Sequence, residues 1–162
     1  MQNLTAACFL GSSFTGAPRM TDDTIKMNVL YVDDDRVNLR VLADMLGAFG
    51  ITVTCALGGA EALEFLAVQA FDVVLMDLHM PGLTGVETLA QLRKGAGLNQ
   101  QTPVVAVTAD VGFENEHAAM GFAGFLAKPV SMKPLLAAVL GALHARAGMA
   151  PLRRLRSGAG VS

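Results

Sequence analysis

Residues 72–85, DVVLMDLHMPGLTG, constrain the fold more than any other stretch of the chain. The run from Val73 to Met76 is apolar throughout and rich in branched residues, which is typical of a strand buried on both faces of a parallel sheet. It ends on one carboxylate, Asp77, and proline and glycine residues typical of turns follow. Open α/β sheets bind ligands at the carboxyl ends of their strands. Asp77 is therefore either a ligand-binding group or a cap for the turn, and this stretch alone leaves both open.

The rest of the chain alternates strand-like and helix-like segments. The apolar runs predict strands over residues 28–32, 52–56, 72–77, 103–107 and 124–127. Helical spacing and turn residues predict helices over residues 36–48, 60–69, 86–94, 113–120 and 132–146. In the first helix, the residues expected to face the core are Val37, Leu39, Val41, Leu42, Met45 and Leu46. This alternation predicts an α/β fold with a parallel sheet, right-handed crossovers and helices on both faces.

The length of 162 residues and the 52% hydrophobic content suit one domain with a sizeable core. We expect residues 27–146 to form this domain. Residues 1–26 mix small and polar residues without periodicity and are expected to be a disordered leader. Residues 147–162 are rich in arginine and glycine, and we expect a basic flexible tail that is too short for an output domain.

The charge distribution bears on the partners. Residues 27–145 carry twelve acidic and six basic side chains, so this segment has a net charge of −6. An acidic domain argues against DNA as the main partner and suits a divalent cation. No apolar stretch of the sequence reaches the length of a membrane span, so no membrane partner is expected. Cys8 and Cys55 suggest no disulfide framework, which fits a reducing, cytoplasmic location.

Polar groups of complementary chemistry follow four of the predicted strands. Asp33 and Asp34 follow the first strand, and Asp77 ends the third. Thr108 follows the fourth strand and Lys128 the fifth. Because parallel strands end along one edge of a sheet, we expect these groups to converge.

The chemistry of these groups indicates a role for each. Carboxylates from two strands match a hard cation such as Mg²⁺, with Mn²⁺ as a substitute. Lys128 offers charge and Thr108 a directed hydrogen bond to a phosphoryl group. Asp77 beside the metal can then act as a nucleophile toward phosphorus.

Four segments carry a resemblance to a known family. They are residues 29–35, VLYVDDD; residues 74–82, VLMDLHMPG; Val107 to Ala109, VTA; and the dipeptide Lys128-Pro129. In this order and spacing they resemble the receiver domain of two-component response regulators, CheY-like. The match covers residues 27–145. The pattern VNLRVL over residues 37–42 is most similar to receivers of hybrid histidine kinases.

The resemblance implies a fold and the site residues of a phosphoacceptor. The fold would be the flavodoxin-like (βα)5 doubly wound parallel sheet with strand order 2-1-3-4-5. Asp77 would accept the phosphoryl group. Metal ligands would be Asp34 and Asp77 directly, Asp33 through water, and the backbone carbonyl of His79.

The remaining implied roles concern phosphate binding and switching. Thr108 and Lys128 would bind the phosphoryl oxygens, and Phe125 occupies the aromatic switch position beside the switch residue Thr108. His79 and Asp110 stand where the family tunes the lifetime of the phosphate. The peptide before Pro129 would be cis.

The leading hypothesis is a single-domain response regulator. A phosphohistidine of a sensor kinase or histidine phosphotransfer protein would supply the phosphoryl group to Asp77. The surface of the fourth helix, fifth strand and fifth helix would then switch and signal to a downstream protein. The domain would be no enzyme beyond its own phosphotransfer and autodephosphorylation.

Three alternatives stay open in different degrees. The first is a receiver module of a hybrid histidine kinase or a phosphorelay sink. The second is a Mg²⁺-dependent aspartyl phosphohydrolase, which typically carries a second aspartate where this chain has His79. A DNA-binding regulator is the third, and the arginine-rich tail is the only basic segment that could serve it.

Overall fold

The computed structural model describes residues 26–148 except 111, 113–114 and 117–119. Its five strands are β1 (Asn28–Val32), β2 (Thr52–Ala56), β3 (Val73–Asp77), β4 (Val104–Thr108) and β5 (Gly124–Ala127). The helices in the described part are α1 (Arg36–Gly47), α2 (Gly59–Val68), α3 (Gly85–Lys94) and α5 (Met132–Arg146). These bounds match the predicted elements to within about one residue, and the helix predicted over residues 113–120 lies largely outside the described residues.

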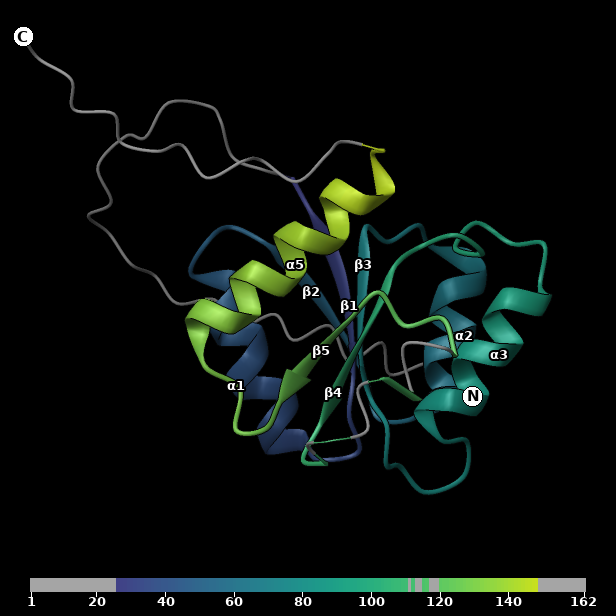
Figure 1. Cartoon of the computed structure of the whole chain (residues 1–162), viewed down its shortest axis with the longest axis horizontal. Helices are drawn as coiled ribbons and strands as arrows, with labels where there is room; N and C mark the ends of the chain where they lie inside the picture. The colour runs from purple at the N-terminus through teal and green to yellow at the C-terminus, as the bar shows by residue number, and fades with distance from the viewer. Residues whose placement is uncertain (1–25, 111, 113–114, 117–119, 149–162) are drawn as a thin grey trace, which may run out of the picture.

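The strands form one parallel sheet in the order β2-β1-β3-β4-β5. This order confirms the predicted doubly wound fold. Helices α1 and α5 cover one face of the sheet, and α2 and α3 cover the other (Figure 1). No helix in the described part of the chain is long and apolar enough to cross a membrane.

Alternation along each strand divides the core into two layers. Val29 and Tyr31 of β1 face α1 and α5, whereas Leu30 and Val32 face α2 and α3. Strand β3 is buried along its whole length because both faces are covered. Cys55 lies in the first layer and is buried.

Helix α1 corrects one part of the sequence interpretation. Leu39, Leu42 and Leu46 are buried, but Val37 is 69% exposed and Val41 52% exposed. The prediction that these two valines face the core was wrong. Helix α1 covers the sheet along a single stripe, and Val37 and Val41 lie outside it.

Asp72, in the turn before β3, holds the two ends of the domain together. Its Oδ2 accepts a hydrogen bond of 2.8 Å from the backbone N–H of Asn28, where β1 begins. Its Oδ1 lies 3.9 Å from the guanidinium of Arg146, where α5 ends. Arg146 also donates a 2.9 Å hydrogen bond to the carbonyl of Phe71. The first strand and the last helix therefore meet at the edge of the sheet where β3 begins.

Candidate phosphoacceptor and metal site

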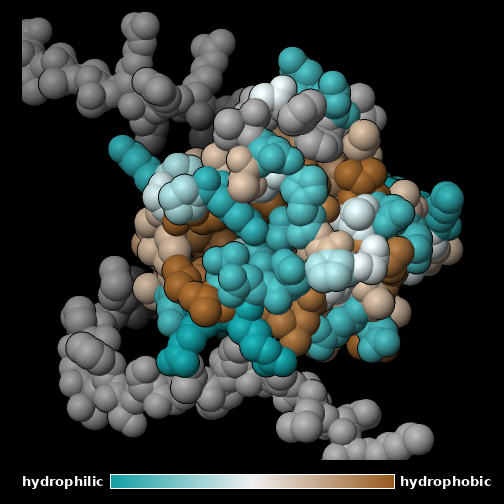
Figure 2. Space-filling view, turned by 90° about the horizontal axis from the view of Figure 1, so that it is seen from below, coloured by the Kyte–Doolittle hydropathy of each residue, from teal (hydrophilic) through white to brown (hydrophobic). Residues whose placement is uncertain are grey.

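The carboxyl ends of the strands form a polar edge. Viewed from this side, hydrophilic side chains gather near the middle of the molecule, with hydrophobic side chains around them (Figure 2). Asp33, Asp77 and Thr108 are buried here within an otherwise apolar sheet. Parallel topology alone places them together, since β1, β3 and β4 are neighbours that all end at this edge.

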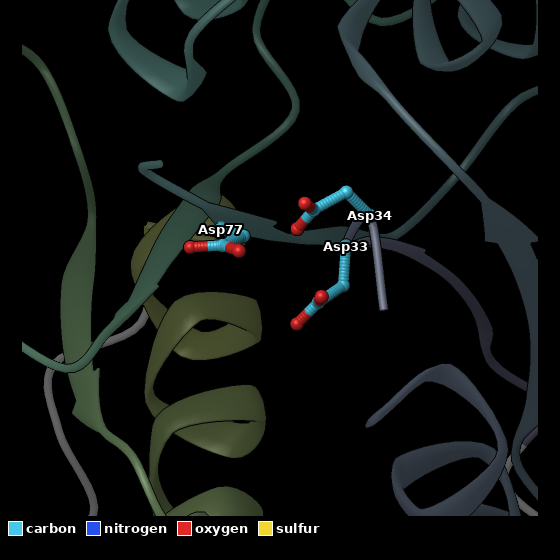
Figure 3. Close-up of side chains that lie close together, drawn as sticks. All are labelled: Asp33, Asp34 and Asp77. Carbon is cyan, nitrogen blue, oxygen red and sulfur yellow. The ribbon is translucent and has the colours of Figure 1, made fainter. Parts of the chain in front are cut away.

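Three carboxylates converge at this edge. Asp33 and Asp34 follow β1, Asp77 ends β3, and the three side chains point toward one another (Figure 3). One ligand oxygen from each lies within 4.8 Å of the others. Oxygen donors alone, at this spacing, are what Mg²⁺ prefers, so the residues present fit a hard divalent cation.

Lys128 joins the first and third strands of this cluster. Its ammonium lies 3.0 Å from Asp33 Oδ2 and 3.1 Å from Asp77 Oδ2. The structure therefore brings together the lysine and the acids that the sequence predicted to converge. The peptide between Lys128 and Pro129 is cis, as the resemblance implied.

Burial and pairing shift the pKa values of this pair. Burial raises the pKa of Asp77, and the hydrogen bonds from Lys128 and from the His79 N–H only partly oppose this effect. For Lys128, burial lowers the pKa, but its hydrogen bonds to Asp33 and Asp77 outweigh burial, and the net shift is upward. Lys128 therefore stays cationic, ready to pair with negative charge.

Thr108 ends β4, next to β3. In the register of the two strands Asp77 pairs with Val107, so Thr108 stands one residue further along the edge. Its hydroxyl is buried and accepts a 3.0 Å hydrogen bond from the backbone N–H of Asp110. Thr108 thus ends the strand next to that of Asp77, and its hydroxyl is hydrogen-bonded to the loop that follows β4.

His79 and Asp110 form a contact that the sequence did not predict. His79 Nε2 and Asp110 Oδ2 lie 2.6 Å apart, and both side chains are exposed. The backbone N–H of His79 lies 3.2 Å from Asp77 Oδ1. The two positions implied to tune phosphate lifetime therefore bridge the loops after β3 and β4.

Phe125 lies two strands from Asp77, because β4 stands between β3 and β5. It sits in β5, is partly buried, and packs against the core layer of α2 and α3. Its ring centroid is 6.2 Å from that of Phe122 in a tilted arrangement. The structure thus places Phe125 as an aromatic side chain of β5 that faces the core layer under α2 and α3.

Sequence reasoning missed two side chains that contact Asp33. Tyr31 Oη donates a 2.7 Å hydrogen bond to Asp33 Oδ2, and Asn38 Nδ2 donates one of 3.3 Å to the same oxygen. A signal for Tyr31 was present, because its hydroxyl is the one polar side-chain group between the aliphatic residues 29–32. Since side chains alternate along a strand, Tyr31 also lies on the same face as Asp33, two residues later. Asn38 gave no comparable signal.

The loop between Asp77 and α3 is fixed locally. The Thr84 hydroxyl caps α3 by accepting a hydrogen bond from the Glu87 N–H, and the Glu87 carboxylate accepts one from the Thr84 N–H in a reciprocal capping box. Gly82 adopts a positive φ of 78°. Gly85 packs so tightly that an added Cβ would overlap the carbonyl oxygen of Asp77. These residues hold the turn that follows β3, the strand of Asp77.

The fold and the side-chain cluster together define a class of protein. It is a doubly wound α/β domain with three carboxylates and a lysine ammonium at the carboxyl edge of its sheet.

The chain belongs to the response regulator receiver domain family, whose model matches residues 29–140. It is 40% identical over 114 residues to the sensory/regulatory protein RpfC of Xanthomonas campestris pv. campestris, covering 68% of this chain and 16% of that protein. This chain thus spans a small part of that relative. The match confirms the predicted resemblance to receivers of two-component systems.

Solved structures agree with this assignment. The chemotaxis response regulator CheY4 of Vibrio cholerae superposes with a TM-score of 0.68 at 30% identity, covering 73% of this chain and 99% of that one. The receiver domain of sensor histidine kinase PA1611 from Pseudomonas aeruginosa PAO1 gives a TM-score of 0.67 at 27% identity, covering 73% and 98%. That structure has a magnesium ion coordinated in the active site cleft.

Proposed function

We propose that this chain accepts a phosphoryl group on Asp77 in a Mg²⁺-dependent transfer. The observation that carries this proposal is the Lys128 ammonium 3.1 Å from Asp77 Oδ2, in a cluster of three carboxylates. A buried aspartate beside a cation site and a fixed ammonium is equipped to attack phosphorus and to tolerate the charge that develops. The family of the chain and the magnesium-bound relative support the same role.

The transfer balances simply. An oxygen of Asp77 forms a bond to phosphorus while the bond from phosphorus to the donor nitrogen of a phosphohistidine breaks, and the imidazole leaves with a proton from solvent. Lys128 and the Thr108 hydroxyl bind the phosphoryl oxygens. A bound Mg²⁺ would supply charge neutralisation at those oxygens.

The three carboxylates of the cluster would hold the ion, and the resemblance implies how they share this role. Asp34 and Asp77 would bind the ion directly, and Asp33 would act through a bound water. The backbone carbonyl of His79 would supply a further oxygen. Mn²⁺ is expected to substitute, since it accepts the same oxygen ligands.

For the donor we propose a sensor histidine kinase or a histidine phosphotransfer protein, and for the output a protein rather than DNA. The net acidity of residues 27–145 supports a protein partner. Movement of Thr108 toward the phosphoryl group, followed by Phe125, would alter the surface around β5. His79 and Asp110, which bridge the two loops at the cleft, would influence how long the phosphate lasts.

Two arrangements fit a phosphoacceptor at Asp77: a domain that acts alone, and a receiver within a phosphorelay. We retain the single-domain regulator as the proposal, with a hybrid-kinase or phosphorelay-sink receiver as the alternative, which the similarity to the receiver domain of sensor histidine kinase PA1611 supports. A phosphotransfer profile against purified kinases and phosphotransfer proteins separates the two. A single-domain regulator accepts the phosphoryl group and retains it. A relay receiver passes the phosphoryl group on to the histidine of a phosphotransfer protein. The cytoplasmic location stays a prediction.

The experiment that tests the acceptor is labelling with a small-molecule phosphodonor. Acetyl phosphate with Mg²⁺ should phosphorylate the wild type, and Asp77→Asn should stay unlabelled because its amide cannot act as the nucleophile. Intact-mass spectrometry measures the product. Asp44→Asn, which changes an exposed aspartate of α1, is the matched control and should label like the wild type. Equal labelling of Asp77→Asn would refute the assignment.

A further inference from the structure

Tyr31 is the only tyrosine of the chain, and the proposed function does not use it. It lies in the middle of the sheet, in β1, and is 1% exposed. A buried hydroxyl without a partner is costly, so its hydrogen bond matters. That hydrogen bond is the 2.7 Å contact with Asp33 Oδ2, described above. The one polar aromatic of the core therefore points its polar end at the metal cluster.

The Asp33 carboxylate is held from several sides. It is fully buried, and its Oδ2 accepts hydrogen bonds from Tyr31 Oη, Asn38 Nδ2 and Lys128 Nζ. Its Oδ1 accepts one described hydrogen bond, of 2.8 Å, from the backbone N–H of Asp35. An oxygen that accepts one hydrogen bond keeps acceptor capacity, which a metal-bound water can use. The donors on Oδ2 thus fix the carboxylate and leave Oδ1 to accept a hydrogen bond from a metal-bound water.

Lys128 has two competing uses in this arrangement. Its ammonium is shared between Asp33 and Asp77, at 3.0 and 3.1 Å. When it turns to a phosphoryl group on Asp77, Asp33 loses a donor. A buried carboxylate stripped of its donors is strongly unfavourable. Because Tyr31 and Asn38 continue to donate to Oδ2, the carboxylate stays satisfied without Lys128.

Space beside these donors permits this change. A cavity of about 150 Å³ is lined by Tyr31, Asn38 and Lys128 together with residues of α1 and the β5–α5 loop. The lysine side chain can therefore shift without displacing the tyrosine ring, which is packed into the core layer of α1 and α5.

We propose that Tyr31 is a positioning residue of the metal site: with Asn38, it fixes the Asp33 carboxylate in the orientation that receives Mg²⁺ through water, and so releases Lys128 for the phosphoryl group. This inference rests on the proposed function, because it needs the cation site at Asp33, Asp34 and Asp77. It concerns a residue that touches neither the ion nor the phosphoryl group.

The first test removes only the hydroxyl. Tyr31→Phe keeps the ring that packs in the core, and Mg²⁺ binding to the full chain is followed by isothermal titration calorimetry. Loss of a residue that orients a metal ligand weakens binding on the order of tenfold, so we expect the dissociation constant to rise by about that factor. A dissociation constant within about twofold of the wild type, for a folded variant, would overturn the inference.

The matched control removes a buried hydroxyl elsewhere. Thr102, just before β4, lies at the opposite edge of the sheet and bonds to the Phe71 carbonyl and to Asn99. Thr102→Val should lower the thermal stability yet leave the Mg²⁺ dissociation constant unchanged. Equal weakening of Mg²⁺ binding by both variants would mean that general loosening of the fold, and not the contact with Asp33, explains the effect.

The second test follows Tyr31 in the wild type, without any change to the tyrosine itself. The chain has one tyrosine and no tryptophan, so its tyrosine absorption band reports Tyr31 alone. Mg²⁺ should shift this band with the midpoint found by calorimetry, and Asp34→Ala should abolish the shift at the same concentrations. Calorimetric binding with an unchanged tyrosine band would overturn the inference. Failure of the wild type to bind Mg²⁺ at all would instead refute the proposed metal site.

Discussion

Three consecutive aspartates after β1 have three different environments. Asp33 is fully buried and paired with Lys128, whereas Asp34 is exposed at the mouth of the carboxylate cluster. Asp35 is the N-cap of α1, and its Oδ1 accepts a 2.7 Å hydrogen bond from the Val37 N–H. A run that reads as one patch of negative charge in the sequence therefore divides into a paired acid, a candidate ligand and a helix cap.

This division predicts opposite effects for two neighbouring substitutions. Asp34→Ala should weaken Mg²⁺ binding strongly, because it removes a direct ligand, with little loss of folding stability. Asp35→Ala should cost about 1 kcal/mol of folding free energy, because it removes the cap, with Mg²⁺ affinity nearly unchanged. Calorimetric Mg²⁺ titration and urea unfolding in the presence of a chelator measure the two quantities. Equal losses of Mg²⁺ affinity in both variants would contradict the assignment.

At the same scale, the sequence predicted the residues that end strands and missed those that act through side-chain geometry. Asp77 and Lys128 could be found because parallel strands must end at one edge, whatever the details of packing. The contacts of Tyr31 and Asn38 with Asp33, and of His79 with Asp110, depend on side-chain rotamers. No periodicity or turn signal carries that information.

At the scale of the elements, the start of α3 lies directly against the end of β3, the strand of Asp77. Gly85 approaches the backbone of Asp77 and Leu78 so closely that a side chain cannot fit without movement of the backbone. Its N–H also donates a 3.1 Å hydrogen bond to the Leu78 carbonyl. A methyl group at this position would push α3 away from the end of β3.

We therefore expect Gly85→Ala to destabilise the fold by about 1–3 kcal/mol, the usual cost of an overpacked site. Gly141→Ala is the matched control, since Gly141 lies inside α5 with open space around its Cα, and alanine there should add about 0.5–1 kcal/mol. Urea unfolding monitored by circular dichroism measures both. An unchanged free energy of unfolding for Gly85→Ala would show that the turn after β3 can move to accommodate the methyl group.

The elements themselves could be predicted almost completely, and their exposed faces could not. Apolar runs and turn residues located each described strand and helix, because burial on both faces leaves a continuous apolar pattern. Val37 and Val41 fit the apolar stripe of α1 but are exposed. How wide a stripe the sheet covers is set by the packing of α1 on its neighbours, which the sequence of the helix does not contain.

For the molecule as a whole, metal binding and folding should be linked. The three carboxylates come from the ends of two strands, so the cluster exists only when the sheet is formed. An ion that binds the folded chain alone stabilises it by mass action. It also relieves the repulsion of like charges held together at this edge.

We predict that Mg²⁺ at 100 times its dissociation constant adds about 2.7 kcal/mol to the free energy of unfolding. The melting temperature should rise accordingly and return to its starting value with a chelator. Asp34→Ala should show no rise at the same Mg²⁺ concentration. Thermal unfolding by circular dichroism gives the measurement, and a melting temperature of the wild type that is indifferent to Mg²⁺ would contradict the linkage.

Asp72 has a consequence for how such a domain can be used. Because it holds the first residue of β1 and the last turn of α5 side by side, the chain enters and leaves the domain at nearly the same point. That point lies one strand length, about 17 Å, from the carboxylate cluster. A domain whose chain enters and leaves at neighbouring points can be inserted between other domains without displacing them. The carboxylate cluster then lies at the edge of the sheet opposite the points of attachment.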